Sequence, residues 1–97
     1  MTIRVTDEAL EVLQRSLELG GVDAATGGIR LRAARELGGG VRVHVELAAA
    51  PAEGEEILEA GGIRIFIDAS VTEAMPSAVV ALEPEHERVV VRPEGQE

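Results

Sequence analysis

Residues 29–47, IRLRAARELGGGVRVHVEL, decide the fold of this chain. Apolar side chains alternate with polar ones on both sides of the glycine-rich segment 36–40, a pattern typical of two strands joined by a hairpin turn. A turn that is symmetric about Gly38 pairs apolar residues on one face: Ile29–Leu47, Leu31–Val45 and Ala33–Val43. The other face then carries the polar pairs, Arg30–Glu46 and Arg32–His44. Both faces agree with this register, so we expect the hairpin to adopt it.

The segment before the hairpin predicts one short strand and one long helix. The apolar run 3–5 ends at Thr6, a residue type that commonly caps helix N-termini. Apolar residues then recur at helical spacing between Asp7 and Leu19: Leu10, Leu13 and Leu17. Gly20 and Gly21 are expected to end this amphipathic helix.

The segment after the hairpin predicts a loop over 48–56, several short strands and one more helix. The expected strands are 57–58, 63–67, 79–82 and 89–91. A short helix is expected over 68–75, capped by Asp68 or Ser70 and ended by Pro76. Residues 93–97 are expected to form a frayed tail.

Together these elements predict one domain over residues 1–97, of the α+β class and mostly β. Two small sheets should pack around one core, with the N-terminal helix against them. With a single aromatic residue in 97, the core must rest on branched aliphatic side chains. Besides the three helix leucines, its expected members are Ile29, Leu31, Val43, Val45, Ile63, Ile65 and Ile67.

Composition excludes several classes of function. The chain has no Cys, so it offers no disulfide, no thiol nucleophile and no thiolate metal ligand. A net charge of −9 argues against nucleic acid as a partner, which would require clustered cations. No apolar run approaches the roughly 20 residues of a membrane span, and acids near the N-terminus are unlike a signal peptide. We therefore expect a soluble, cytoplasmic protein.

The negative charge is concentrated in the second half of the chain. Residues 1–50 carry seven acidic and six basic residues, whereas 51–97 carry eleven and three. We expect an acidic surface supplied by these side chains: Glu53, Glu55, Glu56, Glu59, Glu83, Glu85 and Glu87. If the protein has a protein partner, the contact surface of that partner should be basic. The alternative is that the charge only keeps a small protein in solution.

Candidate metal ligands are few. His44 and Glu46 share one face of a strand, and His86 lies between two glutamates in a predicted turn. The alternative for the first pair is a solvated polar face on which Arg30 pairs with Glu46. Arg32 opposite His44 would repel a bound cation. We favour solvated side chains at both places and predict no metal site and no cofactor.

No motif indicates an enzyme. The glycines 38–40 could bind an anion through backbone amides, but no Lys-Ser/Thr follows them and they do not begin a helix. The carboxylates of 53–59 are expected to form a solvated edge instead of a convergent acid–base pair. The chain's serines, Ser16, Ser70 and Ser77, have no nucleophile motif around them.

The order of these elements resembles the HesB-like domain of A-type iron–sulfur carrier proteins. The resemblance covers about residues 3–93 and rests on four short segments: Ile3–Ala9 (IRVTDEA), Gly28–Leu31 (GIRL), Val45–Leu47 (VEL) and Ile67–Asp68 followed by Ser70. It implies a compact, β-rich fold of two sheets with one N-terminal helix and a short second helix, and self-association as a homo-oligomer.

The resemblance also implies iron or iron–sulfur binding by three cysteines, one in the turn of the central hairpin and a Cys-x-Cys pair near the C-terminus. In this chain the hairpin position falls at or beside Gly38, and there is no Cys to match any of them. The sequence thus indicates a cysteine-free branch of the family. The expected function is that of a non-catalytic accessory or protein-interaction domain. The alternative is a weak mononuclear metal binder using His44, His86 and carboxylates.

Overall fold

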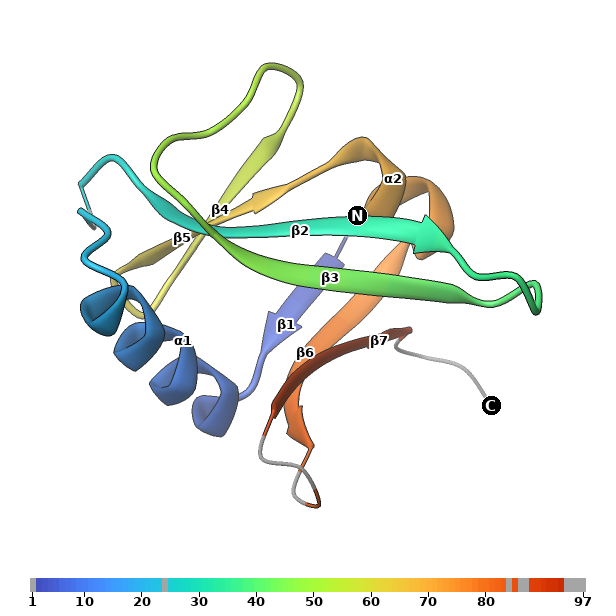
Figure 1. Ribbon diagram of the computed structural model, residues 1–97, viewed down its shortest axis with the longest axis horizontal. Helices are drawn as coiled ribbons and strands as arrows, with labels where there is room; N and C mark the ends of the chain where they lie inside the picture. Colours follow the sequence, from blue (N-terminus) through green and yellow to red (C-terminus); the bar gives the residue numbers. More distant parts are fainter. Residues whose placement is uncertain (1, 24, 84, 86–87, 94–97) are drawn as a thin grey trace.

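The computed structural model describes residues 2–23, 25–83, 85 and 88–93 of the chain. The described residues form two helices and two β-sheets (Figure 1). In chain order the elements are β1 (Thr2–Val5), α1 (Asp7–Leu19), β2 (Gly28–Arg35), β3 (Val41–Ala48), β4 (Glu56–Ala60), β5 (Ile63–Ile67), α2 (Ala69–Ala74), β6 (Ser77–Glu83) and β7 (Arg88–Pro93). The α+β class and the two-sheet architecture are confirmed.

The four-stranded sheet has the order β3-β2-β5-β4 and the three-stranded sheet the order β1-β6-β7. In each sheet one neighbouring pair is parallel, β2 with β5 and β1 with β6. Helix α1 packs against β2, β6 and β7, and α2 packs against β2 near the opposite end of that strand (Figure 1). The core lies between the two sheets and these helices.

The predicted hairpin register is confirmed at every pair. Ile29 faces Leu47, Arg30 faces Glu46 and the pairing continues to Arg35 and Val41. The turn closes where the Glu36 N–H donates to the Gly40 carbonyl at 2.8 Å.

The predicted helix boundaries are also confirmed. The Thr6 hydroxyl accepts a hydrogen bond from the Ala9 N–H at 3.2 Å, which satisfies one unpaired donor of the first turn of α1. Asp68 caps α2 in the same way by accepting from the Ser70 N–H. Along the stripe of α1, Leu13 and Leu17 are buried, whereas Leu10 is half-buried against the turn before β5.

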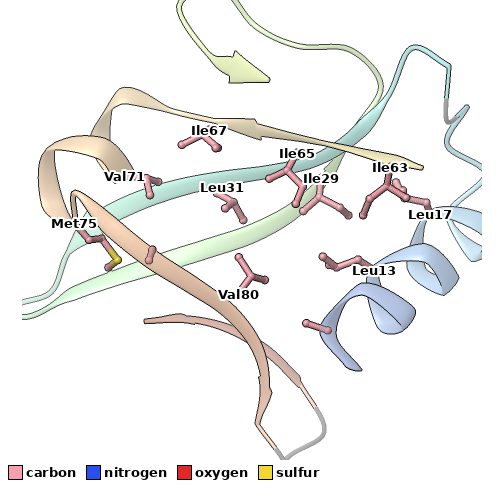
Figure 2. Close-up of a cluster of buried hydrophobic side chains, with 12 residues drawn as sticks. Leu13, Leu17, Ile29, Leu31, Ile63, Ile65, Ile67, Val71, Met75 and Val80 are labelled. Atoms are coloured by element: carbon pink, nitrogen blue, oxygen red, sulfur yellow. The ribbon is translucent and has the colours of Figure 1, made fainter. Parts of the chain in front are cut away.

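The predicted core is right in its centre and wrong at its edge. The expected isoleucines of β2 and β5 and Leu31 are buried (Figure 2). Val43 and Val45 are only half-buried, because β3 is the outermost strand of its sheet and has a neighbour on one side alone. The buried residues that the pattern missed lie mostly in α2 and β6: Val71, Met75, Ala78, Val80, Ala81 and the fully buried Phe66 of β5.

The C-terminal prediction needs one change. Pro93 is the last residue of β7 and pairs with Ala78, so it belongs to the sheet and not to a frayed tail. The other residues of that expected tail, 94–97, lie outside the described part of the chain. Among the described residues, no helix is long and apolar enough to cross a membrane.

Candidate functional site

The predicted metal ligands lie on an exposed strand. His44 and Glu46 are both exposed on the outward face of β3, the face turned away from the core. Arg32 of β2 is the register partner of His44 and its guanidinium lies 3.8 Å from the Glu46 carboxylate. Within the described ranges, no three His, Cys, Asp or Glu side chains come together to bind a metal ion. The third candidate, His86, lies outside the described residues.

The expected ion pair between Arg30 and Glu46 is wrong, because Arg30 binds a loop carboxylate. Arg30 Nε donates to Glu55 Oε2 at 2.6 Å and Arg30 Nη2 donates to Glu55 Oε1 at 3.2 Å. The same Nη2 donates to the Ala50 carbonyl at 3.0 Å. A bidentate pair of arginine and carboxylate is stronger and more specific in geometry than a single hydrogen bond between neutral groups.

Glu55 also corrects the prediction that the carboxylates of 53–59 form a solvated edge. Its side chain is only 2% exposed, and that of Arg30 is 18% exposed. The Arg30 hydrogen bond lowers the pKa of Glu55, against the opposing effect of burial, and the bond from the Ala52 N–H lowers it further. The two hydrogen bonds from Arg30 to Glu55, with a third from Arg30 to the Ala50 carbonyl, fix the loop between β3 and β4 to the sheet; we call this contact the Arg30–Glu55 clamp.

Phe66 of β5 is fully buried although it does not belong to the core cluster between the sheets. Phe66 is the register neighbour of Arg30 on one side and of Ile57 on the other, so all three share the outward face. Arg30 fixes the loop at Ala50 and Glu55 next to this position.

A second polar contact joins α2 to β2. The Ser70 hydroxyl donates to Asp68 Oδ2 at 2.5 Å and accepts from the Ala33 N–H at 3.0 Å. The hydrogen bonds that the Ser70 hydroxyl and the Ser70 N–H donate to Asp68 lower the pKa of Asp68. Burial opposes this shift, and the charges of Arg32 and Arg30 lower the pKa further. These hydrogen bonds join α2, β2 and the residue that caps α2 to one another.

The hairpin tip and the strand next to it expose three large apolar side chains. Leu37 at the tip is fully exposed, and Val41 and Leu47 at the two ends of β3 are 42% and 41% exposed. An open groove follows β3 and separates it from β7. Valines of both strands line it, with polar side chains at its borders: Val41, Val43, Val45, Val89, Val90 and Val91, and Glu36, Arg42, His44 and Arg88.

The expected acidic surface is smaller than the sequence suggested. Glu53, Glu56, Glu59 and Glu85 are exposed, whereas Glu55 is withdrawn into the clamp with Arg30. Glu59 lies 3.9 Å from Arg64, and Glu83 lies 3.6 Å from Arg88. Glu87 lies outside the described residues.

Comparison with solved protein structures identifies the fold. No family model and no curated protein sequence matches the chain. Among solved structures, Escherichia coli SufA, involved in biosynthesis of iron–sulfur clusters, matches with a TM-score of 0.74 and 14% identity over 98% of this chain and 83% of SufA. The chain therefore has the fold of the A-type iron–sulfur carriers, the HesB-like fold.

Two further structures agree with this assignment. IscA, whose crystal structure contains the [2Fe-2S] cluster, matches with a TM-score of 0.72 and 23% identity over 94% of this chain and 82% of IscA. A protein from Aquifex aeolicus, determined in solution by NMR, matches with a TM-score of 0.64 and 16% identity over 95% of this chain and 91% of that protein. At these identities the likeness concerns the fold, and these 97 residues contain no Cys.

Proposed function

We propose that this chain is a non-catalytic accessory or protein-interaction domain that uses the fold of iron–sulfur carriers and does not bind a cluster itself. The observation that carries the proposal is the combination of that fold with a sequence that has no thiol. Iron–sulfur clusters are held mainly by thiolates, and His replaces thiolates only in part. The turn of the β2–β3 hairpin, where the family resemblance places a Cys, carries Gly38 instead. We accordingly regard the chain as a cysteine-free relative of the carriers.

The polar arrangement of the described residues favours this function over catalysis. Two of its polar contacts, Arg30 with Glu55 and Ser70 with Asp68, bind elements of the fold to one another. A general acid or base must instead be able to reach a substrate proton. Exposed glutamates, among them Glu53 and Glu56, and the exposed apolar side chains of β3, Val41 and Leu47, are suited to contact with a protein.

A weak mononuclear metal site is the less favoured function. Hard carboxylate ligands could bind a hard cation, but Glu46 lies near the guanidinium of Arg32. That positive charge disfavours a cation between Glu46 and His44. Titration calorimetry with iron, zinc and manganese tests this alternative. Binding that is lost in both His44→Ala and Glu46→Gln, but kept in Glu59→Gln, would establish the metal site.

The proposal is tested by anaerobic reconstitution with ferrous iron and sulfide, followed by desalting and an absorption spectrum. We expect a colourless protein whose circular dichroism shows that it is still folded. Sulfide-to-iron charge-transfer bands in near-stoichiometric yield, retained after desalting, would overturn it. The control is Gly38→Cys, which restores one thiol at the hairpin turn and shows whether the assay detects iron held by a single thiolate.

For an interaction domain we further propose that a protein partner contacts the exposed glutamates with a basic surface. Association with a partner isolated from native lysate should then slow as salt is raised, because surface charges are screened. Glu53→Gln and Glu56→Gln should slow the association at low salt, and Glu11→Gln on α1 should not. An association rate that does not change with salt would contradict this electrostatic contact.

A further inference from the structure

The loop between β3 and β4, residues 49–55, is tied to the sheet by the side chain of Arg30. Residues 49–54 are exposed, whereas the side chain of Glu55 is only 2% exposed. Within the described part of the chain, the hydrogen bonds of this loop all involve Arg30 or Glu55. Those between Ala52 and Glu55 lie inside the loop and shape its turn. The hydrogen bonds that attach the loop to the sheet are therefore those of the Arg30–Glu55 clamp.

The loop lies on the face of the four-stranded sheet that points away from the core. On the other face, Ile29, Leu31 and Ile65 belong to the core cluster, together with residues of both helices and of β6. Neighbouring side chains of a strand point to opposite faces, so Arg30 and Phe66 lie on the outward face, where they are register neighbours. In Figure 1 the loop is seen on the opposite side of β2 and β3 from β6 and β7.

Phe66 is fully buried on this outward face. A side chain that stands out from a sheet is covered by what lies over the same face. Of the two register neighbours of Phe66, Ile57 is itself 49% exposed, and Arg30 carries the loop. Both helices and β6 bury their apolar residues on the core side instead. The loop is thus the segment positioned to exclude water from Phe66.

We propose that residues 49–55 form a lid that opens and closes over Phe66 while the two sheets stay folded, and that the Arg30–Glu55 clamp holds it closed. The closed lid withdraws Arg30 and Phe66 from solvent. The open lid exposes a cation and an aromatic ring beside Ile57, so opening changes the chemical character of this face. The lid involves neither a metal nor a partner, and it is therefore independent of the proposed function.

The composition and the charges around the lid allow it to open. Its residues are Ala, Pro, Gly and Glu, which bury little apolar area, and segments with few buried contacts open locally at low free energy. The pKa of Arg30 is raised mainly by its hydrogen bond to Glu55, against the effect of burial, and also by the charges of Glu46 and Asp68. Since Glu46 and Asp68 are not part of the lid, Arg30 keeps negative charges near it when Glu55 moves away.

Hydrogen exchange measured by NMR tests whether the lid opens separately from the core. The probes are the N–H groups of Ala52 and Glu55, bonded inside the closed lid, and that of Thr6, bonded to the Val80 carbonyl. We expect the two lid amides to be less protected than Thr6, with protection that depends much less on low concentrations of denaturant. Equal protection of all three with the same denaturant dependence would overturn the lid, because the loop would then open only on global unfolding.

Glu55→Gln tests the clamp. It removes one charge of the pair and should speed exchange of the Ala52 N–H at least about tenfold in a protein that circular dichroism shows to be folded. Glu46→Gln is the matched control, because Glu46 acts on Arg30 through its charge alone and is not bonded to the lid. It should leave the Ala52 exchange rate unchanged. Equal rates in the two variants would show that the clamp does not hold the lid closed.

A strained backbone tests the lid with the clamp left intact, and it does not depend on whether Glu55→Gln folds. Gly54 in the lid has a φ of 85° and Gly39 at the hairpin tip a φ of 90°, and a Cβ added at either meets no atom within 4 Å. Alanine therefore strains only the local backbone at both positions. Gly54→Ala should speed exchange of the Ala52 N–H about fivefold, and Gly39→Ala should not. A response to both variants or to neither would contradict a lid that opens by itself.

The ring of Phe66 reports on what the lid covers, because the chain has no other Phe, Tyr or Trp. A soluble paramagnetic relaxation agent should broaden the ring signals of Phe66 more in Glu55→Gln than in the unmodified chain. Glu46→Gln should show no such increase. If the ring stays equally protected in Glu55→Gln while the Ala52 N–H exchanges faster, the loop opens without uncovering Phe66, and the proposed lid is wrong.

Discussion

Strands β2 and β3 have the same alternation of apolar and polar side chains, but the structure uses them differently. In β2, Ile29 and Leu31 are each 1% exposed. Of their register partners in β3, Leu47 is 41% exposed and Val45 is half-buried. The difference lies in position, because β2 has strands on both sides and β3 has one on one side. Alternation thus determines which face of a strand turns inward, and the neighbours of the strand determine how far it is buried.

The sharpest test of this comparison makes one substitution in both strands. Leu31→Ala removes a fully buried side chain and leaves a cavity, so the free energy of unfolding should fall by about 3 kcal/mol. Leu47→Ala removes a side chain that is already 41% exposed and should lower the free energy of unfolding by about 1 kcal/mol. Chemical denaturation of both variants gives these values.

Leu13→Ala in α1 serves as a reference, because Leu13 is only 2% exposed. This substitution should lower the free energy of unfolding by about 2–5 kcal/mol. Equal losses for Leu31→Ala and Leu47→Ala would mean that β3 is covered in solution.

Local signals predicted much of the fold. The boundaries of α1, its Thr6 cap and the hairpin register depend on residues close in sequence, and all are as expected. The parallel pairs β1–β6 and β2–β5 join distant segments, and no short pattern predicts which strands will meet. The edge position of β3 follows from those pairings. Its partial burial was therefore beyond the reach of the alternation pattern.

The same comparison extends to the arginines on the outward face of β2. Arg30 binds the buried Glu55, whereas Arg32 lies 3.8 Å from the exposed Glu46. Glu55→Gln leaves a largely buried guanidinium without its counter-charge and should lower the free energy of unfolding by about 2 kcal/mol. Glu46→Gln should change it by less than about 0.5 kcal/mol, since exposed ion pairs contribute little. Thermal denaturation of both variants at neutral pH makes the comparison, and a larger loss for Glu46→Gln would refute it.

Lowering the pH should destabilise the fold, because it protonates Glu55 and Asp68. The pKa of Glu55 and that of Asp68 lie below their ordinary values of 4.5 and 3.8, so both carboxylates favour the folded state when ionised. Their contribution is complete above those ordinary values and is lost as the pH falls through the lowered ones. Denaturation curves from neutral pH to about pH 3 should therefore show falling stability. Glu55→Gln should flatten this dependence; an unchanged slope would show that Glu55 is not part of it.

The clamp could not be predicted from the sequence, for a physical reason. Arg30 and Glu55 are 25 residues apart, and the cross-strand partner Glu46 offered a nearer carboxylate. The loop after β3 brings Glu55 back to the sheet, where hydrogen bonds to the Ala52 N–H and Arg30 satisfy it. For the candidate metal ligands, the sequence did predict the local surroundings, because the register that sets Arg32 opposite His44 is the one observed.

The smallest effect on stability is expected for a substitution at the hairpin tip. Glycines differ in whether the surrounding structure leaves room for a side chain. Gly28 at the start of β2 has no room for a side chain, because a Cβ would collide with the backbone carbonyl of Arg64. Gly38 has no atom near an added Cβ and a backbone that other residues also adopt, whereas Gly39 has a φ of 90°.

Gly38→Cys should therefore change the free energy of unfolding by less than about 0.5 kcal/mol, while Gly39→Cys should lower it by about 1 kcal/mol through backbone strain. Chemical denaturation under reducing conditions measures both. If Gly38→Cys is as costly as Gly39→Cys, the turn itself requires Gly at position 38. If it is neutral, the fold tolerates a thiol where the iron–sulfur carriers are expected to have one, and folding does not explain why this chain lacks it.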